Sequence, residues 1–147
     1  MSGQVSALNA TQAAGTAAMK DQARAGERRW GGRWTVTAWP ASIDVDVNNP
    51  RYLGAWASLE LEAEPPGRSY TVFIIVALVD DPTLLRIDAS IDRPAMGCDI
   101  ERVAEIAPRD VPLDEGPIVA VEFVEQICRR LEELLLSGGE PAQEPRR

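Results

Sequence analysis

The feature that most constrains the fold is the segment 72–79, within "SYTVFIIVALV", where every residue is apolar. Turn signals bound this run, because "PPGR" at 65–68 precedes it and "DDPT" at 80–83 follows it, and proline and glycine favour turn conformations. A short apolar run between turns is typical of a strand that is covered on both faces. The segment therefore predicts a central strand covered twice, or a strand whose second face meets another subunit.

Apolar and polar residues alternate in the segments around this run, as they do in strands with one buried face. The alternation predicts five strands in meander order, at 33–40, 42–47, 53–64, 69–79 and 84–91. The first strand should end at Pro40, because proline has no amide hydrogen to donate to a neighbouring strand.

The pattern changes after these strands. Asp99 is a suitable N-cap for a short helix over 100–107, "IERVAEIA", and Pro108 would end that helix.

The last patterned segment, 117–136, has two interpretations. "PIVAVEFV" is rich in β-branched residues, which allows a strand at 118–123 followed by a shorter helix. A single long helix is favoured, because Pro117 suits the first helical turn and Gly138 can cap the end. Its apolar stripe would comprise Ile118, Val121, Val124, Cys128, Leu131 and Leu135.

Both ends of the chain are polar and rich in small residues. Residues 1–27 show no sustained apolar periodicity and 138–147 contain glycine and proline, so both are expected to be disordered tails. The domain between them, 28–137, is expected to be α+β: an antiparallel meander sheet or a partly closed small β-barrel, with a C-terminal helix.

The composition excludes several kinds of catalytic and metal site, but it does not assign a function. The chain of 147 residues contains no histidine, which removes Ser-His-Asp and Cys-His catalysis. Its two cysteines, Cys98 and Cys128, are too few for a four-ligand zinc site without histidine and are expected to be buried free thiols. We expect no catalytic residues, no metal and no cofactor.

The net charge of −8 argues against binding to nucleic-acid polymers, whose phosphates attract Lys and Arg. No apolar run is long enough to span a membrane, and the N-terminus does not have the pattern of a secretory signal. A cytoplasmic location is therefore expected. The acidity permits a basic protein partner.

Acidic residues recur at the outward positions of the expected strands, together with a tryptophan that can anchor a partner. Charge of this kind steers association with a basic protein, while an apolar centre gives affinity. The alternative is a solvated face that only keeps the protein soluble. The partner-binding candidates are Asp44, Asp46, Trp56, Glu60 and Glu62, with Glu64 and Asp88 on the same side.

A second set of residues resembles the PilZ family, the bacterial receptor domains for cyclic-di-GMP. "RWGGR" supplies Arg29 and Arg33 in the spacing of the family's RxxxR segment, and "NPRYLG" supplies Asn49 and Gly54 of its turn motif. Arg51 stands where the family has a serine. The resemblance implies a cyclic dinucleotide whose phosphates the two arginines would bind. The alternative is that these arginines are solvated residues next to a tail.

Taken together, the sequence predicts a non-catalytic acidic adaptor domain that binds another protein and self-associates through an apolar sheet face. The alternative is a degenerate PilZ-like receptor that uses Arg29 and Arg33.

Overall fold

The computed structural model describes residues 2–30, 34–45, 53–63, 69–94 and 99–136. They form a single antiparallel sheet with the strand order β1-β2-β3-β4-β5, in which each strand pairs with the next one along the chain. The α+β class and the meander order are thus confirmed, and the sheet is open, not closed into a barrel. The elements are α1 (Ser2–Trp30), β1 (Trp34–Val45), β2 (Leu53–Ala63), β3 (Ser69–Leu78), β4 (Leu84–Pro94), β5 (Ile100–Pro112), the 3₁₀ turn η1 (Leu113–Glu115) and α2 (Gly116–Leu136).

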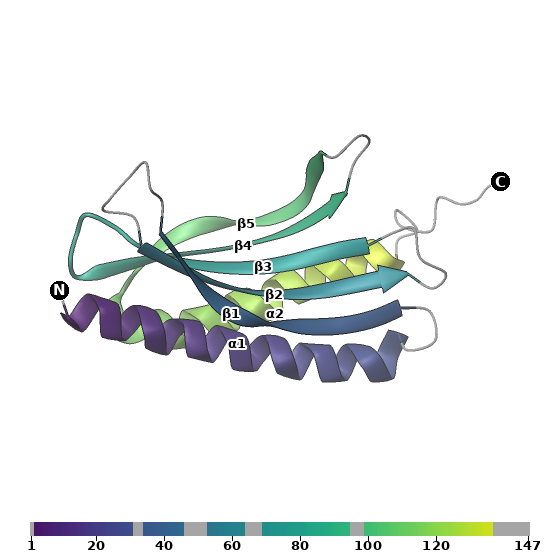
Figure 1. The fold of residues 1–147 in the computed structure, drawn as a ribbon, viewed down its shortest axis with the longest axis horizontal. Helices are drawn as coiled ribbons and strands as arrows, with labels where there is room; N and C mark the ends of the chain where they lie inside the picture. The colour runs from purple at the N-terminus through teal and green to yellow at the C-terminus, as the bar shows by residue number, and fades with distance from the viewer. Residues whose placement is uncertain (1, 31–33, 46–52, 64–68, 95–98, 137–147) are drawn as a thin grey trace.

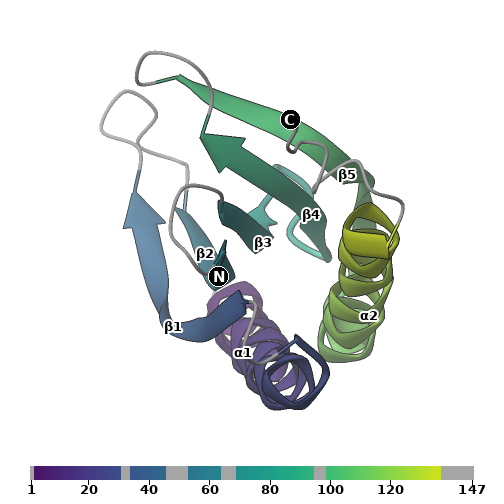
Figure 2. The ribbon, with the colours of Figure 1, turned by 90° about the vertical axis from the view of Figure 1, so that its right-hand side faces the viewer.

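Both helices lie on the same face of the sheet, with α1 nearest β1 and β2 and α2 nearest β4 and β5 (Figures 1 and 2). Alternate residues of the strands point toward them, and Val72, Ile74 and Val76 of β3 are buried in the centre. A Cβ built on Gly15 of α1 would lie 3.5 Å from Ile74 Cγ2 and 3.9 Å from Ala120 Cβ of α2. The core therefore lies where the two helices and the central strand meet.

The expectation of a disordered tail is wrong for residues 2–27, because they belong to the long helix α1. The helix has a buried stripe, but most of its members are small or polar, so the stripe carries little apolar signal in the sequence. Its buried residues are Gln4, Leu8, Thr11, Gly15, Met19, Ala23 and Gly26, at helical spacing. Small side chains let the helix approach the sheet closely. The expected C-terminal tail, 138–147, lies outside the described residues.

The prediction of a short helix at 100–107 is also wrong, because this segment is the first part of strand β5 and pairs with β4. The apolar residues Ile100, Val103 and Ile106 have helical spacing in the sequence. In the structure, two register shifts between β4 and β5 change the alternation along the strand. Pro108 lies at one of these shifts on an edge strand, where a missing amide hydrogen breaks no regular ladder.

The strands expected at 33–40 and 42–47 are one strand, β1, as far as its end at Val45. The pairing of β1 with β2 changes register between Trp39 and Ser42. Pro40 lies within this irregularity, so it does not end the strand as expected. The five observed strands therefore combine two of the expected ones and add β5.

The single long helix at the C-terminal end is confirmed as α2. Its buried face is rotated from the expected stripe, since Ile118 is 65% exposed and Val121 is half-buried. The buried face is broad because it packs against both the sheet and α1. It comprises Val119, Ala120, Phe123, Val124, Ile127, Cys128 and Leu131.

The contact between the two helices depends on Gly116 in the first turn of α2. Its backbone is helical, with φ −51° and ψ −52°, but an added Cβ would lie 2.2 Å from Thr11 Oγ1. We expect Gly116→Ala to lower the free energy of unfolding by about 1–3 kcal/mol, the usual cost of overpacking. Urea denaturation measures this change.

Gly3→Ala is the matched control, because a Cβ at Gly3 has nothing within 4 Å. It should change the free energy of unfolding by less than about 1 kcal/mol. Equal losses in the two variants would contradict a steric contact between the helices.

The Cys128 thiol is free and buried, as expected from the sequence, while Cys98 lies outside the described residues. Burial, with a smaller contribution from Glu132, raises the pKa of the Cys128 thiol to about 12. The thiolate is the reactive form, so in a Cys98→Ser protein we expect almost no reaction with DTNB until urea unfolds the chain. Rapid labelling of the folded protein would show that the thiol is accessible.

Candidate functional site

The face of the sheet opposite the helices is the candidate site. On β3 it carries Phe73, Ile75 and Ala77, which are half-buried although α1 and α2 both lie on the other face. In the pairing with β4, Phe73 lies opposite Ser90 and Ile75 lies opposite Asp88. The second apolar side of β3 is therefore part of a surface. We call it the open face.

Acidic residues dominate the described part of the open face. Six carboxylates lie at positions that alternate with the core residues of β2, β4 and β5, against two guanidinium groups, a formal excess of four negative charges. The carboxylates are Glu60, Glu62, Asp88, Asp92, Glu105 and Asp110, and the guanidinium groups are Arg86 and Arg102.

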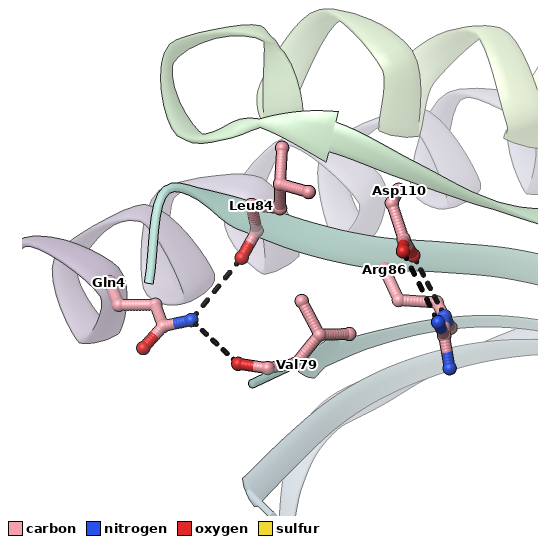
Figure 3. A network of polar contacts seen from close by, with 5 residues as sticks. All are labelled: Gln4, Val79, Leu84, Arg86 and Asp110. Carbon is pink, nitrogen blue, oxygen red and sulfur yellow. Dashed lines mark hydrogen bonds and ion pairs between the residues drawn. The ribbon is translucent and has the colours of Figure 1, made fainter. Parts of the chain in front are cut away.

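Both arginines of the open face are already paired with carboxylates of the neighbouring strand. Arg86 binds Asp110 through two contacts, Nε to Oδ1 at 2.8 Å and an amino nitrogen to Oδ2 at 3.2 Å (Figure 3). The hydrogen bond from Arg86 holds the pKa of Asp110 below its ordinary value. Arg102 Nε lies 3.0 Å from Asp92 Oδ1. These pairs join β4 to β5 and engage both arginines of the described part of the open face.

A depression of about 670 Å³ lies at the end of the open face next to the turn between β3 and β4. Apolar side chains and charged groups line it together, an arrangement that suits a ligand with an aliphatic stem and a charged end. The lining consists of Ile75, Ala77, Leu78 and Val79, with Asp80, Asp81, Arg86, Asp88 and Asp110.

The aspartates that line the depression differ in the hydrogen bonds and ion pairs that their carboxylates make. Asp81 accepts hydrogen bonds from Thr83 Oγ1 at 2.6 Å and from the Thr83 backbone amide at 2.9 Å, which lower its pKa. Asp110 is held by Arg86. Asp88 is half-buried and makes no hydrogen bond or ion pair in the part of the chain that the structure describes. Burial raises the pKa of Asp88, and the more distant charge of Arg102 opposes that effect.

Gln4 of α1 anchors the turn that borders the depression (Figure 3). Its side-chain Nε2 donates to the carbonyl oxygens of Val79 at 3.2 Å, Asp81 at 3.3 Å and Leu84 at 3.2 Å. Sequence reasoning missed this residue because it assigned 1–27 to a tail. The one available signal was the spacing of Gln4 and Leu8, four residues apart on one helical face.

The structure describes only part of the predicted partner-binding set. Glu60 is half-buried and Glu62 is exposed, and both lie on the open face. Asp44 is the backbone partner of Gly54 and Trp56 that of Ile75, but their side chains lie outside the described part. Asp46 and Glu64 also lie outside it. The structure adds Asp92, Glu105 and Asp110 to the same face.

The structure describes two of the four residues of the PilZ resemblance, Arg29 and Gly54. Arg29 lies in the last turn of α1 and forms an ion pair with Glu132 of α2. Gly54 is buried in β2, while Arg33 and Asn49 fall outside the described residues. The resemblance stays a prediction.

Metal sites and membrane spans can be assessed for the described ranges only. Within them, no cluster of three or more Asp, Glu or Cys side chains has the arrangement of a metal site. Neither α1 nor α2 is long and apolar enough to cross a membrane.

Comparisons of this chain with protein-family models, with curated proteins and with solved structures found no match. Its function therefore has to be inferred from the open face itself.

The half-buried carboxylate of Asp88 predicts a variant that is more stable than the parent. The folded-state pKa of Asp88 lies above the ordinary value of 3.8, so the folded protein holds this proton more tightly than the unfolded chain does. The free energy of unfolding therefore falls as the pH rises from 3.8 through the folded-state pKa, because Asp88 then becomes charged in the folded protein. We expect Asp88→Asn to raise the free energy of unfolding at pH 7, with a gain that shrinks as the pH falls below 3.8.

Urea denaturation across this pH range measures the gain. Asp110→Asn is the control, because its carboxylate has a lowered pKa and its charged form is stabilised by Arg86. That variant should be slightly less stable than the parent at pH 7. A change of stability in the same direction in both variants would show that the carboxylates of Asp88 and Asp110 do not differ in their surroundings as described.

Proposed function

We propose that this chain is a non-catalytic adaptor domain whose open face binds a positively charged segment of another protein. The observation that carries the proposal is Asp88, a half-buried carboxylate beside Ile75 that has no ion pair in the described part of the chain. Burial removes part of the water from this carboxylate, and the charges of Arg102 and Arg86 offset that cost only in part, because the pKa of Asp88 remains raised. Costs of this kind recur at functional sites, where a ligand offsets them.

A lysine or arginine side chain from a partner has the chemistry to occupy the depression. Its aliphatic stem would lie against Ile75 and Ala77, and its charged end would reach Asp88. Arginine suits this position best, because a guanidinium group binds a carboxylate through two parallel hydrogen bonds. Apolar contact thus accompanies charge pairing, which favours a defined site over a diffuse attraction.

The charge of the open face also bears on self-association, which the sequence suggested for the apolar side of β3. Two copies joined through this face would bring their acidic excesses together, and like charges across an interface are unfavourable. A basic partner would instead be attracted at a distance and guided toward the face. We therefore propose a different protein as the partner, not a second copy of this chain.

Fluorescence anisotropy with a labelled peptide in which arginine alternates with alanine tests the proposal. Reversal of two open-face charges, Glu60→Lys with Glu62→Lys, should weaken binding by about tenfold or more, because it replaces attraction with repulsion. Asp88→Asn should also weaken binding while it stabilises the fold. Added salt should weaken binding to the parent protein.

The control reverses the same number of charges on the helix side, with Glu125→Lys and Glu133→Lys on the exposed surface of α2. This variant has the same net charge as the open-face variant and should bind nearly as well as the parent. Equal weakening in the two variants would show that only net charge matters. Absence of binding to the parent protein at low salt would overturn the proposal.

A further inference from the structure

The turn between β3 and β4 depends on a side chain that is 75 or more residues away in sequence. Within the turn, the backbone supplies a hydrogen bond from the Leu84 amide to the Asp81 carbonyl at 3.2 Å, and Thr83 binds the Asp81 side chain. Gln4 reaches the turn from α1 and contacts a carbonyl oxygen before it, one within it and one after it. Gln4 is 7% exposed, so its amide has left water to make these contacts.

The same turn forms one side of the depression. Leu78, Val79, Asp80 and Asp81 of its lining belong to the turn or to the adjoining end of β3. The remaining lining residues lie within the paired strands, where the sheet fixes their backbone. The sheet thus holds one side of the depression, while Gln4 together with the hydrogen bonds of the turn holds the other.

We propose that Gln4 is a positioning residue for the basic partner, which makes the binding site depend on how the first turn of α1 is seated. This inference rests on the function proposed above. Gln4 does not line the depression and would not touch the bound side chain. It acts through the turn, by keeping Asp80 and the adjoining apolar residues at the distance from Asp88 that a lysine or arginine side chain needs.

Three variants at this position separate positioning from charge. Gln4→Met keeps the approximate shape and charge but removes the donor. Gln4→Glu also removes the donor and presents a carboxylate to three carbonyl oxygens, while it adds a negative charge that would attract a basic peptide. Gln4→Lys restores a donor with three hydrogens, although its positive charge would repel that peptide.

The experiment measures the affinity of each folded variant for the labelled arginine–alanine peptide. If Gln4 acts by positioning, the parent should bind the peptide most tightly, Gln4→Lys less tightly and Gln4→Glu less tightly still. Gln4→Met should bind about tenfold or more weakly than the parent. Charge alone predicts the reverse, with Gln4→Glu at least as tight as the parent and Gln4→Lys weakest. Parent-like affinity of Gln4→Met, or the charge order, would overturn the inference.

Ile91→Val separates positioning from a general loss of stability, because it removes one buried methylene group from β4 opposite Val72, at the end of the sheet away from the turn. At a temperature where all variants are folded, it should bind the peptide as the parent does. If it weakens binding as much as Gln4→Met, the role of Gln4 is merely structural and the inference fails. If the parent itself does not bind, the proposed function fails first and the positioning role fails with it.

Discussion

The close seating of α1 on the central strand is the constraint on which the rest of the structure depends. A Cβ at Gly15 would lie at ordinary van der Waals distance from Ile74 of β3 and Ala120 of α2, which shows how close α1 lies to both elements. At Gly116 an added Cβ would overlap Thr11 Oγ1, so a side chain there would push the first turn of α2 away from α1. Because α1 and α2 fit side by side on one face, they cover the buried side of β3, and neither of them lies on its other side.

That arrangement determines which face of the sheet the proposed partner would bind. The side of β3 that faces away from α1 and α2 keeps its half-buried apolar residues beside the carboxylates of β2, β4 and β5. An apolar strip alone would favour any hydrophobic contact, and carboxylates alone would remain hydrated. Their combination around Asp88 is what favours a cationic side chain with an aliphatic stem. The same helix that creates this asymmetry also holds one side of the site through Gln4.

Sequence reasoning succeeded where a regular repeat coincided with burial on one side. Alternation located β2, β3 and β4, the 3.6-residue repeat located α2, and strand parity placed Glu60, Glu62 and Asp88 on one face. It failed for α1, whose buried stripe includes Gln4, Thr11 and Gly15 and so lacks an apolar pattern. It failed for β5, where register shifts disturb the alternation. The hydrogen bonds of Gln4 join segments far apart in the chain, and no local pattern indicates them.

The irregular pairing of β5 has a consequence for the kind of recognition open to this domain. At that edge, Pro108 and Pro112 offer no amide hydrogens and the register changes twice, so an incoming strand would find no continuous row of backbone partners. Strand addition relies mainly on backbone groups, which nearly every sequence possesses. The binding proposed for the open face would instead discriminate by residue type, so partners recognised there would share a chemical pattern and need not share an extended conformation.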